Sequence, residues 1–264
     1  NKYLKKIHKF INSKYENFLY DNVKSQKNYW RVEDQAERDK LAEFRFLKTE
    51  KNHTETDINL INTGTNWYRS HGNNTSNRFS SLKKINNNNA NNLKIAWIFE
   101  HKDFLNDIQA NPIVVDGIIY TPITGGYIAA IDGENGNLIW KSKQYGNFVG
   151  KRGLLYHKPN NKGGISKLYF SNRENLICIN AENGKSVKSF GKDGRIRTGL
   201  NVLTPVIYKD NIIIVTWDHA IEVYNLKNGK REWKLKYKKD INKRVGGKKF
   251  ISNGYNPWGG ISLD

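Results

Sequence analysis

The hydrophobic positions of this chain follow two different patterns. In residues 1 to about 60, apolar side chains such as Leu4, Ile7 and Phe10 recur at helix-like spacing in a polar background, which predicts short helices. From about Leu93 onward, apolar residues occur in short β-branched and aromatic runs separated by Gly, Asn and Asp. Such runs are typical of many short antiparallel strands. We therefore expect a polar, partly helical segment over 1–60 and an all-β region within 61–264.

Two stretches of the β region predict hairpins. PIVVDGIIYTP places Asp116-Gly117 between two apolar runs, and PVIYKDNIIIV places Asp210-Asn211 in the same way. Both pairs tolerate the positive φ angles of a tight hairpin turn. We expect a two-stranded unit at each place.

A longer pattern recurs along the β region. AAIDGENGNLIW at 129–140 is followed by ICINAENGKSVK at 177–188 and EVYNLKNGKREW at 222–233, with the turn glycines 48 and 45 residues apart. A period of about 40 to 50 residues with four strand-sized runs is typical of a β-propeller blade. Three full units fit the chain, at about 106–143, 150–191 and 200–237, and a fourth begins at about 254.

The repeated residues have structural explanations. Gly136 and its two counterparts sit where a turn needs positive φ, and Asp132, four residues earlier, can bond the turn backbone. Trp140 and Trp233 follow the glycine by four residues, and each indole can wedge between adjacent sheets. The second unit has Lys188 at this position, so we expect its edge to pack differently.

Composition restricts the classes of function. The 264 residues are 37% hydrophobic, enough for a real core, and carry a formal charge of +19. The lysines are spread along the chain without a compact basic helix or an aromatic-interleaved basic stripe, so nucleic-acid binding, which would be strongly salt-dependent, is not expected. Cys178 is the single cysteine, which excludes an intrachain disulfide and a CxxC metal site. No apolar run approaches the roughly 18 residues of a membrane helix.

The ends of the chain suggest part of a longer ring. The chain contains no Met, begins on Asn1 and ends on GGISLD as a strand-like run starts. NLKIAWIFEH resembles the last strand of a unit, with Trp97 in the tryptophan position, but no three earlier strands precede it. Because propellers often close by letting one terminus complete the other's blade, we expect the missing strands beyond Asp264.

The repeats, together with RSHGNNTSNRFSSLKKIN and the following NLKIAWIFEH, resemble the quinoprotein dehydrogenases that use pyrroloquinoline quinone (PQQ), of the glucose and alcohol type. The resemblance covers about residues 67–264. The ordered positions that carry it are Trp67, Gly72, Arg78, Phe79, Ser80, Ile85, Asn86, Leu93, Lys94, Ala96 and Trp97. It implies three to four blades of an eight-bladed ring, and a periplasmic protein.

The same resemblance implies three cofactor-binding residues. KRGLLYH is similar to the family's RG-x-x-Y segment, so Arg152 would bind the quinone, whose carboxylates and ortho-dione suit a guanidinium. NPWGGISLD is similar to the segment whose indole lies under the cofactor ring, which points to Trp258. Thr204 in NVLTPVIY would bring a hydroxyl toward cofactor oxygens. The alternative for Arg152 is an ordinary surface arginine, and the alternative for Trp258 is an ordinary core tryptophan.

The chain also departs from family patterns. VGKRG lacks the vicinal cysteine pair of some alcohol dehydrogenases, and Phe148 stands where the glucose type can carry His. TWDHAIEVY is short where some relatives place a calcium-binding Glu, and Asp218 is either a substitute oxygen ligand or a turn residue. The family's general base and a calcium-binding Asn would follow Asp264, so no catalytic residue is assigned within the chain.

Two functions remain in competition. The first is part of a PQQ- and calcium-dependent dehydrogenase that oxidises a sugar or alcohol and passes electrons to a membrane quinone or a cytochrome. The second is a non-catalytic propeller scaffold or binding protein, similar to the outer-membrane assembly lipoprotein built from the same repeat. The SNRFSSLKKIN, KRG and NPWGG segments favour the enzyme, because a scaffold needs only the repeat.

Overall fold

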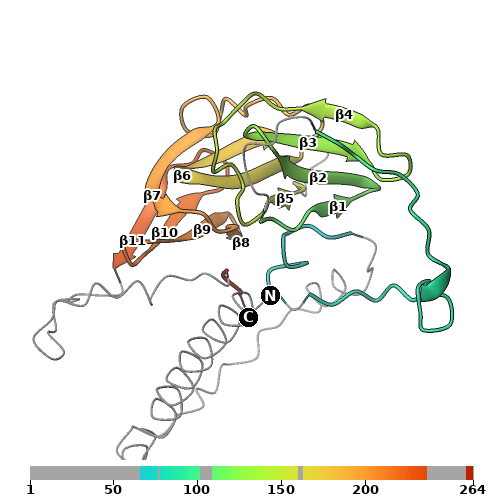
Figure 1. Ribbon diagram of the computed structural model, residues 1–264. Coiled ribbons are helices and arrows are strands. Elements are labelled where there is room, and N and C mark those ends of the chain that lie inside the picture. The colour runs from blue at the N-terminus through green and yellow to red at the C-terminus, as the bar shows by residue number, and fades with distance from the viewer. Residues whose placement is uncertain (1–65, 77, 102–108, 160–162, 237–259, 264) are drawn as a thin grey trace, which may run out of the picture. The chain divides into compact units, whose positions relative to one another are not determined.

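The computed structural model describes residues 66–76, 78–101, 109–159, 163–236 and 260–263. The expected N-terminal helices, the start of a fourth repeat at about 254 and Trp258 lie outside these residues. The described part contains three antiparallel sheets and one short 3-10 turn, Ala90–Asn92, and the all-β prediction is confirmed there (Figure 1). No helix in this part has the length and apolar character needed to cross a membrane.

The first sheet is a four-stranded antiparallel meander. Its strands, in the order β1-β2-β3-β4, are β1 (Ile113–Val115), β2 (Ile118–Ile123), β3 (Tyr127–Asp132) and β4 (Leu138–Lys141). The predicted hairpin joins β1 to β2, since Val115 pairs with Ile118. Asp116 and Gly117 both have positive φ, 50° and 79°, as expected for a tight two-residue turn.

The third sheet repeats this arrangement. Its strands, in the order β11-β10-β9-β8, are β8 (Val206–Tyr208), β9 (Asn211–Thr216), β10 (Ala220–Asn225) and β11 (Arg231–Lys236). The second predicted hairpin is present, but its turn lies one residue earlier than expected. Tyr208 pairs with Asn211, and Lys209 takes the positive φ of 52°, because Asn211 already belongs to the ladder of β9.

The second sheet consists of β5 (Leu155–His157), β6 (Lys167–Asn180) and β7 (Arg195–Asn201). β6 folds back on itself, because Arg173 has a positive φ of 53° and the Ala181 amide donates to the Ser166 carbonyl at 2.9 Å. Its two halves therefore take the places of the second and third strands, and β7 pairs with the second half as β4 pairs with β3. The fourth strand is interrupted, since Ile179 makes an isolated bridge to Ser186 before β7 begins at Arg195. The edge of this unit, which carries Lys188, thus differs from that of the first sheet.

The repeated turns are built alike in all three sheets. Gly136, Gly184 and Gly229 have φ of 77°, 69° and 73°, and each amide donates to the carbonyl of the polar residue four positions earlier. The side-chain oxygen of that polar residue also accepts turn amides; Asp132 accepts from Glu134 at 2.8 Å. These contacts confirm the roles inferred for the repeated glycine and Asp or Asn.

Tryptophans join one unit to the next. The Trp140 indole donates from Nε1 to the carbonyl of Ala181 at 3.0 Å, and its ring lies over Gly184, where a Cβ would come within 2.6 Å. Trp97 docks in the same way, donating to Gly133 at 3.2 Å. Over the third turn, Phe190 and Ile196 replace the missing indole. Trp233 is 50% exposed, because no described sheet lies beyond β11.

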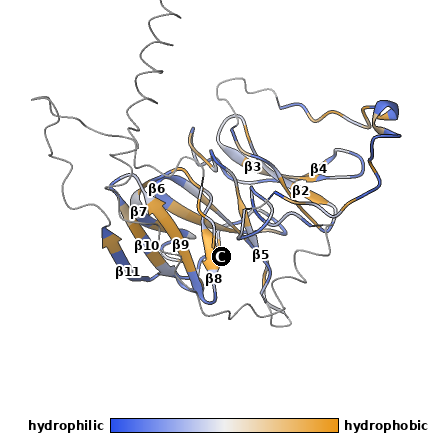
Figure 2. Ribbon diagram, turned by 90° about the horizontal axis from the view of Figure 1, so that it is seen from below, coloured by the Kyte–Doolittle hydropathy of each residue, from blue (hydrophilic) through white to orange (hydrophobic). Residues whose placement is uncertain are grey.

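The core follows the alternation of the two halves of β6, which fold back on each other at Arg173. Leu168 and Phe170 point toward the first sheet, whereas Tyr169 and Cys178 pack against the third, and all four are fully buried. A hairpin buried on both faces is therefore the centre of the described part. Figure 2 shows the same trend, with β8 and β9 strongly hydrophobic. The outermost strand β11 carries the polar sequence REWKLK and is mostly exposed.

Candidate functional site

The segment 66–76 runs past the first strand of every sheet. Trp67 bridges to Val114 of β1, and Arg69 bridges to Leu155 of β5. The Asn74 side chain donates to the carbonyl of Ile207 in β8 at 2.8 Å. The segment therefore brings together the edges at which the three sheets begin.

A cavity of about 260 Å³ lies where the chain enters these first strands. Asn111, Arg152 and Thr204 occupy equivalent places, two or three residues before β1, β5 and β8. The full lining consists of Arg69, His71, Arg78, Gln109, Asn111, Arg152, Leu203, Thr204 and Gly260. The structure thus brings two of the predicted cofactor residues, Arg152 and Thr204, to one cavity, while Trp258 lies outside the described residues.

The backbone of Arg152 is held in place by two hydroxyl groups. Its carbonyl accepts hydrogen bonds from Ser70 Oγ at 2.9 Å and Thr204 Oγ1 at 2.8 Å. The next residue, Gly153, has φ of 117°, and a Cβ there would collide with the Ser70 side chain. The RG pair therefore requires glycine, and the Thr204 hydroxyl donates to the protein backbone.

Arg69 joins the loops around the cavity. Its side chain, 1% exposed, donates to the carbonyls of Pro205 at 2.9 Å, Thr204 at 3.1 Å and Ile261 at 2.7 Å. Burial lowers the pKa of Arg69 to about 10, so the guanidinium remains charged at neutral pH. Its donors are directed at protein carbonyls, which makes Arg69 a positioning residue.

His71 and Arg78 form a second polar pair at the cavity. Arg78 donates to His71 Nε2 at 3.2 Å, which requires that nitrogen to be unprotonated because a guanidinium can only donate. Burial, with the charges of Arg78 and Arg69, lowers the pKa of His71 below its ordinary value. His71 is therefore neutral near pH 7, and Arg78 contributes positive charge to the cavity.

The chemistry of this lining suits an anion. The cavity has three arginines and no Asp or Glu, so its donors match the carboxylates of a quinone such as PQQ. It does not suit calcium, which prefers acidic oxygen ligands. No group of three His, Cys, Asp or Glu is positioned to hold a metal among the described residues.

Asp218, considered as a calcium ligand or a turn residue, lies in the turn between β9 and β10. Its carboxylate accepts hydrogen bonds from Lys234 at 2.8 Å and from Thr216. It does not line the cavity of Arg152. The structure therefore favours the turn role.

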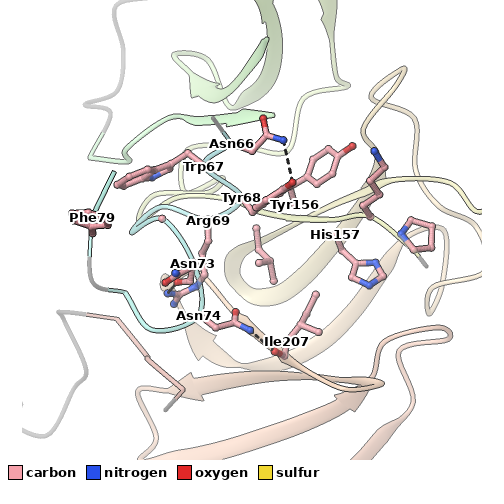
Figure 3. A pocket seen from close by; sticks show the side chains of 14 residues that line it. Asn66, Trp67, Tyr68, Arg69, Asn73, Asn74, Phe79, Tyr156, His157 and Ile207 are labelled. Carbon is pink, nitrogen blue, oxygen red and sulfur yellow. Dashed lines mark hydrogen bonds between the residues drawn. The ribbon is translucent and has the colours of Figure 1, made fainter. Parts of the chain in front are cut away.

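A larger cavity of about 530 Å³ is lined by other residues of segment 66–76, together with residues from β5 to Pro159 (Figure 3). Trp67, Tyr68 and Tyr156 give it an aromatic wall, and the Tyr68 and Tyr156 rings are 6.0 Å apart. Asn66 donates to the Tyr68 hydroxyl at 3.0 Å. Arg69 lines both cavities, but neither Arg152 nor Thr204 lines this one.

Sequence reasoning did not assign Asn111 or Arg69 to the site. Asn111 could have been found, because Asn111-Pro112 stands before β1 as Thr204-Pro205 stands before β8. Arg69 had no comparable signal, since its contacts join residues more than a hundred positions apart.

Sheets of this repeat, arranged around a cationic cavity at their first strands, define a β-propeller domain of the quinoprotein class. The family model for the PQQ glucose/ethanol/alcohol dehydrogenase β-propeller domain matches residues 67–264, and the chain belongs to this family.

Individual relatives agree with this family. Methanol dehydrogenase [cytochrome c] subunit 1 of Methylorubrum extorquens is 29% identical over 195 residues, 67% of this chain and 31% of the relative. Outer membrane protein assembly factor BamB of Moranella endobia is 28% identical over 129 residues, which cover 48% of this chain and 29% of the BamB chain. The chain thus spans under a third of the length of these relatives.

A solved structure supports the fold. The quinohemoprotein alcohol dehydrogenase from Comamonas testosteroni superimposes with a TM-score of 0.54 at 24% identity, covering 69% of this chain and 29% of that protein. The three sheets therefore match part of a quinoprotein propeller.

Proposed function

We propose that this chain forms the cofactor-binding part of a PQQ-dependent dehydrogenase that oxidises a sugar or an alcohol. The observation that carries the proposal is Arg152, held by two hydroxyl groups at the edge of a cavity that arginines line and acidic residues do not. Membership of the PQQ dehydrogenase family supports it. The proposed electron acceptor is a membrane quinone or a cytochrome, and the proposed location is the periplasm.

Each residue of the cavity has a distinct proposed role. When bound, PQQ supplies a carbonyl that accepts hydride from the substrate carbon. The Arg152 guanidinium binds the quinone oxygens and polarises them, and Arg78 adds charge for the carboxylates. Thr204 and Ser70 keep the Arg152 backbone in place. Trp258 is the proposed stacking platform.

The remaining parts of the reaction belong to a complete ring. We propose eight blades, of which this chain contributes three to four after a short helical segment. Calcium and the base that removes the substrate hydroxyl proton would be bound or supplied by residues after Asp264. We expect no turnover from these 264 residues alone.

Titration of PQQ into the full chain with calcium present tests the proposal. We expect saturable quenching of tryptophan fluorescence by PQQ, and we expect Arg152→Ala to raise the Kd at least tenfold because it removes a charged bidentate donor. Arg231→Ala on the exposed strand β11 is the control and should leave the Kd unchanged. Absence of saturable binding, or equal loss in both variants, would contradict a cofactor site at Arg152.

The second candidate is a non-catalytic assembly scaffold or binding protein, favoured by the similarity to BamB over 129 residues. A scaffold needs the sheets but not the cationic cavity. In that case PQQ would not bind. Arg152→Ala would then have no larger effect than the control Arg231→Ala, either on the affinity for a partner or on the stability of the fold.

A further inference from the structure

A third cavity, separate from that of Arg152, lies beside β7 in the second sheet. It measures about 430 Å³ and is lined by Lys143, Tyr145, Asn175, Ile177, Lys192, Asp193, Arg195 and Arg197. Four of these residues are cationic and one is acidic.

The register of β7 places the cations on one face. Arg195 pairs with Ile177 and Arg197 pairs with Asn175, so the side chains of each pair project to the same side of the sheet. Lys192 bridges to Arg195 across the Asp193-Gly194 turn and shares that side. Ile196, between the two arginines, instead joins the core on the opposite face.

The wall opposite this face comes from the connection that follows β4. Lys143 reaches Asp193 at 3.1 Å, which ties the connection to the turn before β7. Tyr145 is 91% buried, since only 9% of its surface is exposed, and it packs edge-on against Phe170 with ring centroids 5.3 Å apart. The cavity therefore has walls from two sheets that the Phe170 core holds together.

Tyr145 contributes its ring to the cavity wall. Its hydroxyl lies behind that wall, inaccessible to solvent and near the Ser186 side chain. A ligand in the cavity therefore meets the cations of β7 and its preceding turn, and not the tyrosine hydroxyl.

We propose that this cavity binds an oxyanion of the phosphate or sulfate class, free or carried on a small molecule. Arg195 and Arg197 bind its oxygens from one wall, and Lys192 adds charge. Arg197 also pairs with Glu174 at 3.2 Å, but that pair is exposed and exchanges readily with an incoming anion. The cavity has more room than a bare phosphate ion fills, which suits a phosphate ester.

Calorimetric titration of inorganic phosphate into the full chain at pH 8, with ionic strength held constant by NaCl, tests the site. We expect one saturable site, at least tenfold weaker binding for Arg195→Gln/Arg197→Gln, and unchanged binding for Tyr145→Phe, whose buried hydroxyl a ligand cannot reach. The matched control, Arg231→Gln/Lys236→Gln, removes the same charge from exposed positions on β11 and should bind as the unmodified chain does. Arg152→Ala should leave phosphate binding unchanged, which separates this site from the proposed PQQ site.

Competition experiments distinguish the sources of the oxyanion. Displacement by glucose 6-phosphate but not by glucose identifies a phosphate ester as a ligand, whereas displacement by sulfate alone identifies a free ion. Failure to saturate with phosphate, or equal weakening in the β11 control, would show that the net charge of the chain attracts anions without a specific site and would overturn the proposal.

Discussion

Gly153 is the position at which the absence of a Cβ atom decides the backbone geometry beside Arg152. The Ser70 side chain occupies the space that a Cβ would need, and the same hydroxyl donates to the Arg152 carbonyl at 2.9 Å. The φ of 117° lies in a region that residues with a side chain rarely adopt. Backbone conformation and close packing therefore both require glycine beside Arg152.

Gly153→Ala should lower the free energy of unfolding by about 2 to 4 kcal/mol, because strain and a steric clash act together. Gly117→Ala is a matched control, since Gly117 also has positive φ, 79°, but has open space where the Cβ would lie. Its cost should be about 1 kcal/mol. Urea unfolding of both variants measures the difference, and equal losses would show that packing against Ser70 adds nothing.

At the scale of elements, the contact between consecutive sheets depends on one large ring. Trp140 leaves the end of β4 and covers the Gly184 turn of the next unit, where its indole also donates a hydrogen bond to Ala181. Glycine is required under the ring because any side chain would displace it. Tryptophan and glycine at these two positions therefore form one structural unit, although they lie 44 residues apart in the chain.

Trp140→Ala should destabilise the chain by about 3 kcal/mol, because it removes this packed ring and leaves a cavity between two sheets. Trp233→Ala removes the same side chain from a position that is 50% exposed in β11, and its cost should stay below about 1 kcal/mol. Thermal unfolding of both variants is the measurement. Similar shifts in Tm would contradict the docking role of Trp140.

The third sheet contains a buried ion pair that makes its stability depend on pH. Lys234 of β11 contacts Glu222 of β10 and Asp218, both at 2.8 Å. Burial alone would raise the pKa of Glu222, but hydrogen bonds from Lys234, Tyr224 and the Gly199 amide outweigh it and lower that pKa. The ionised carboxylate therefore stabilises the folded state.

Because the folded pKa of Glu222 is lowered, its contribution is complete above the unfolded value of about 4.3 and is lost as pH falls through the folded value. Glu222→Gln should destabilise the chain at pH 7 by about 2 kcal/mol and reduce the loss of stability between pH 5 and pH 3. Glu232→Gln, an exposed change on β11, should leave that pH dependence intact. Urea unfolding across this pH range is the measurement, and unchanged pH dependence in Glu222→Gln would assign the acid sensitivity to other groups.

At the scale of the whole molecule, a repeat of 45 to 48 residues organises the described sheets and agrees with a family match over 67–264. The repeat has one consequence for function: equivalent positions before each first strand, Asn111, Arg152 and Thr204, meet at one cavity. A departure from the repeat has another, since the interrupted fourth strand of the second sheet resumes as β7 and places two arginines at one cavity with Tyr145.

Local patterns in the sequence determined the strands, turns and repeat. Alternating apolar residues, a glycine with positive φ and an Asp or Asn four residues earlier act through neighbours in the chain, so the hairpins at Asp116 and near Lys209 could be predicted. The resemblance to a family predicted Arg152 and Thr204 as cofactor-binding residues, and the structure places both at one cavity.

Only the tertiary structure decided which distant groups meet. It showed that Thr204 donates to the Arg152 carbonyl and that Arg69 joins segments 66–76, 204–205 and 260–263. It also showed that the fourth strand of the second sheet is interrupted and resumes as β7. These outcomes depend on packing between residues tens to nearly two hundred positions apart. A local pattern cannot encode such contacts, because several arrangements of the same strands satisfy it and only side-chain packing distinguishes them.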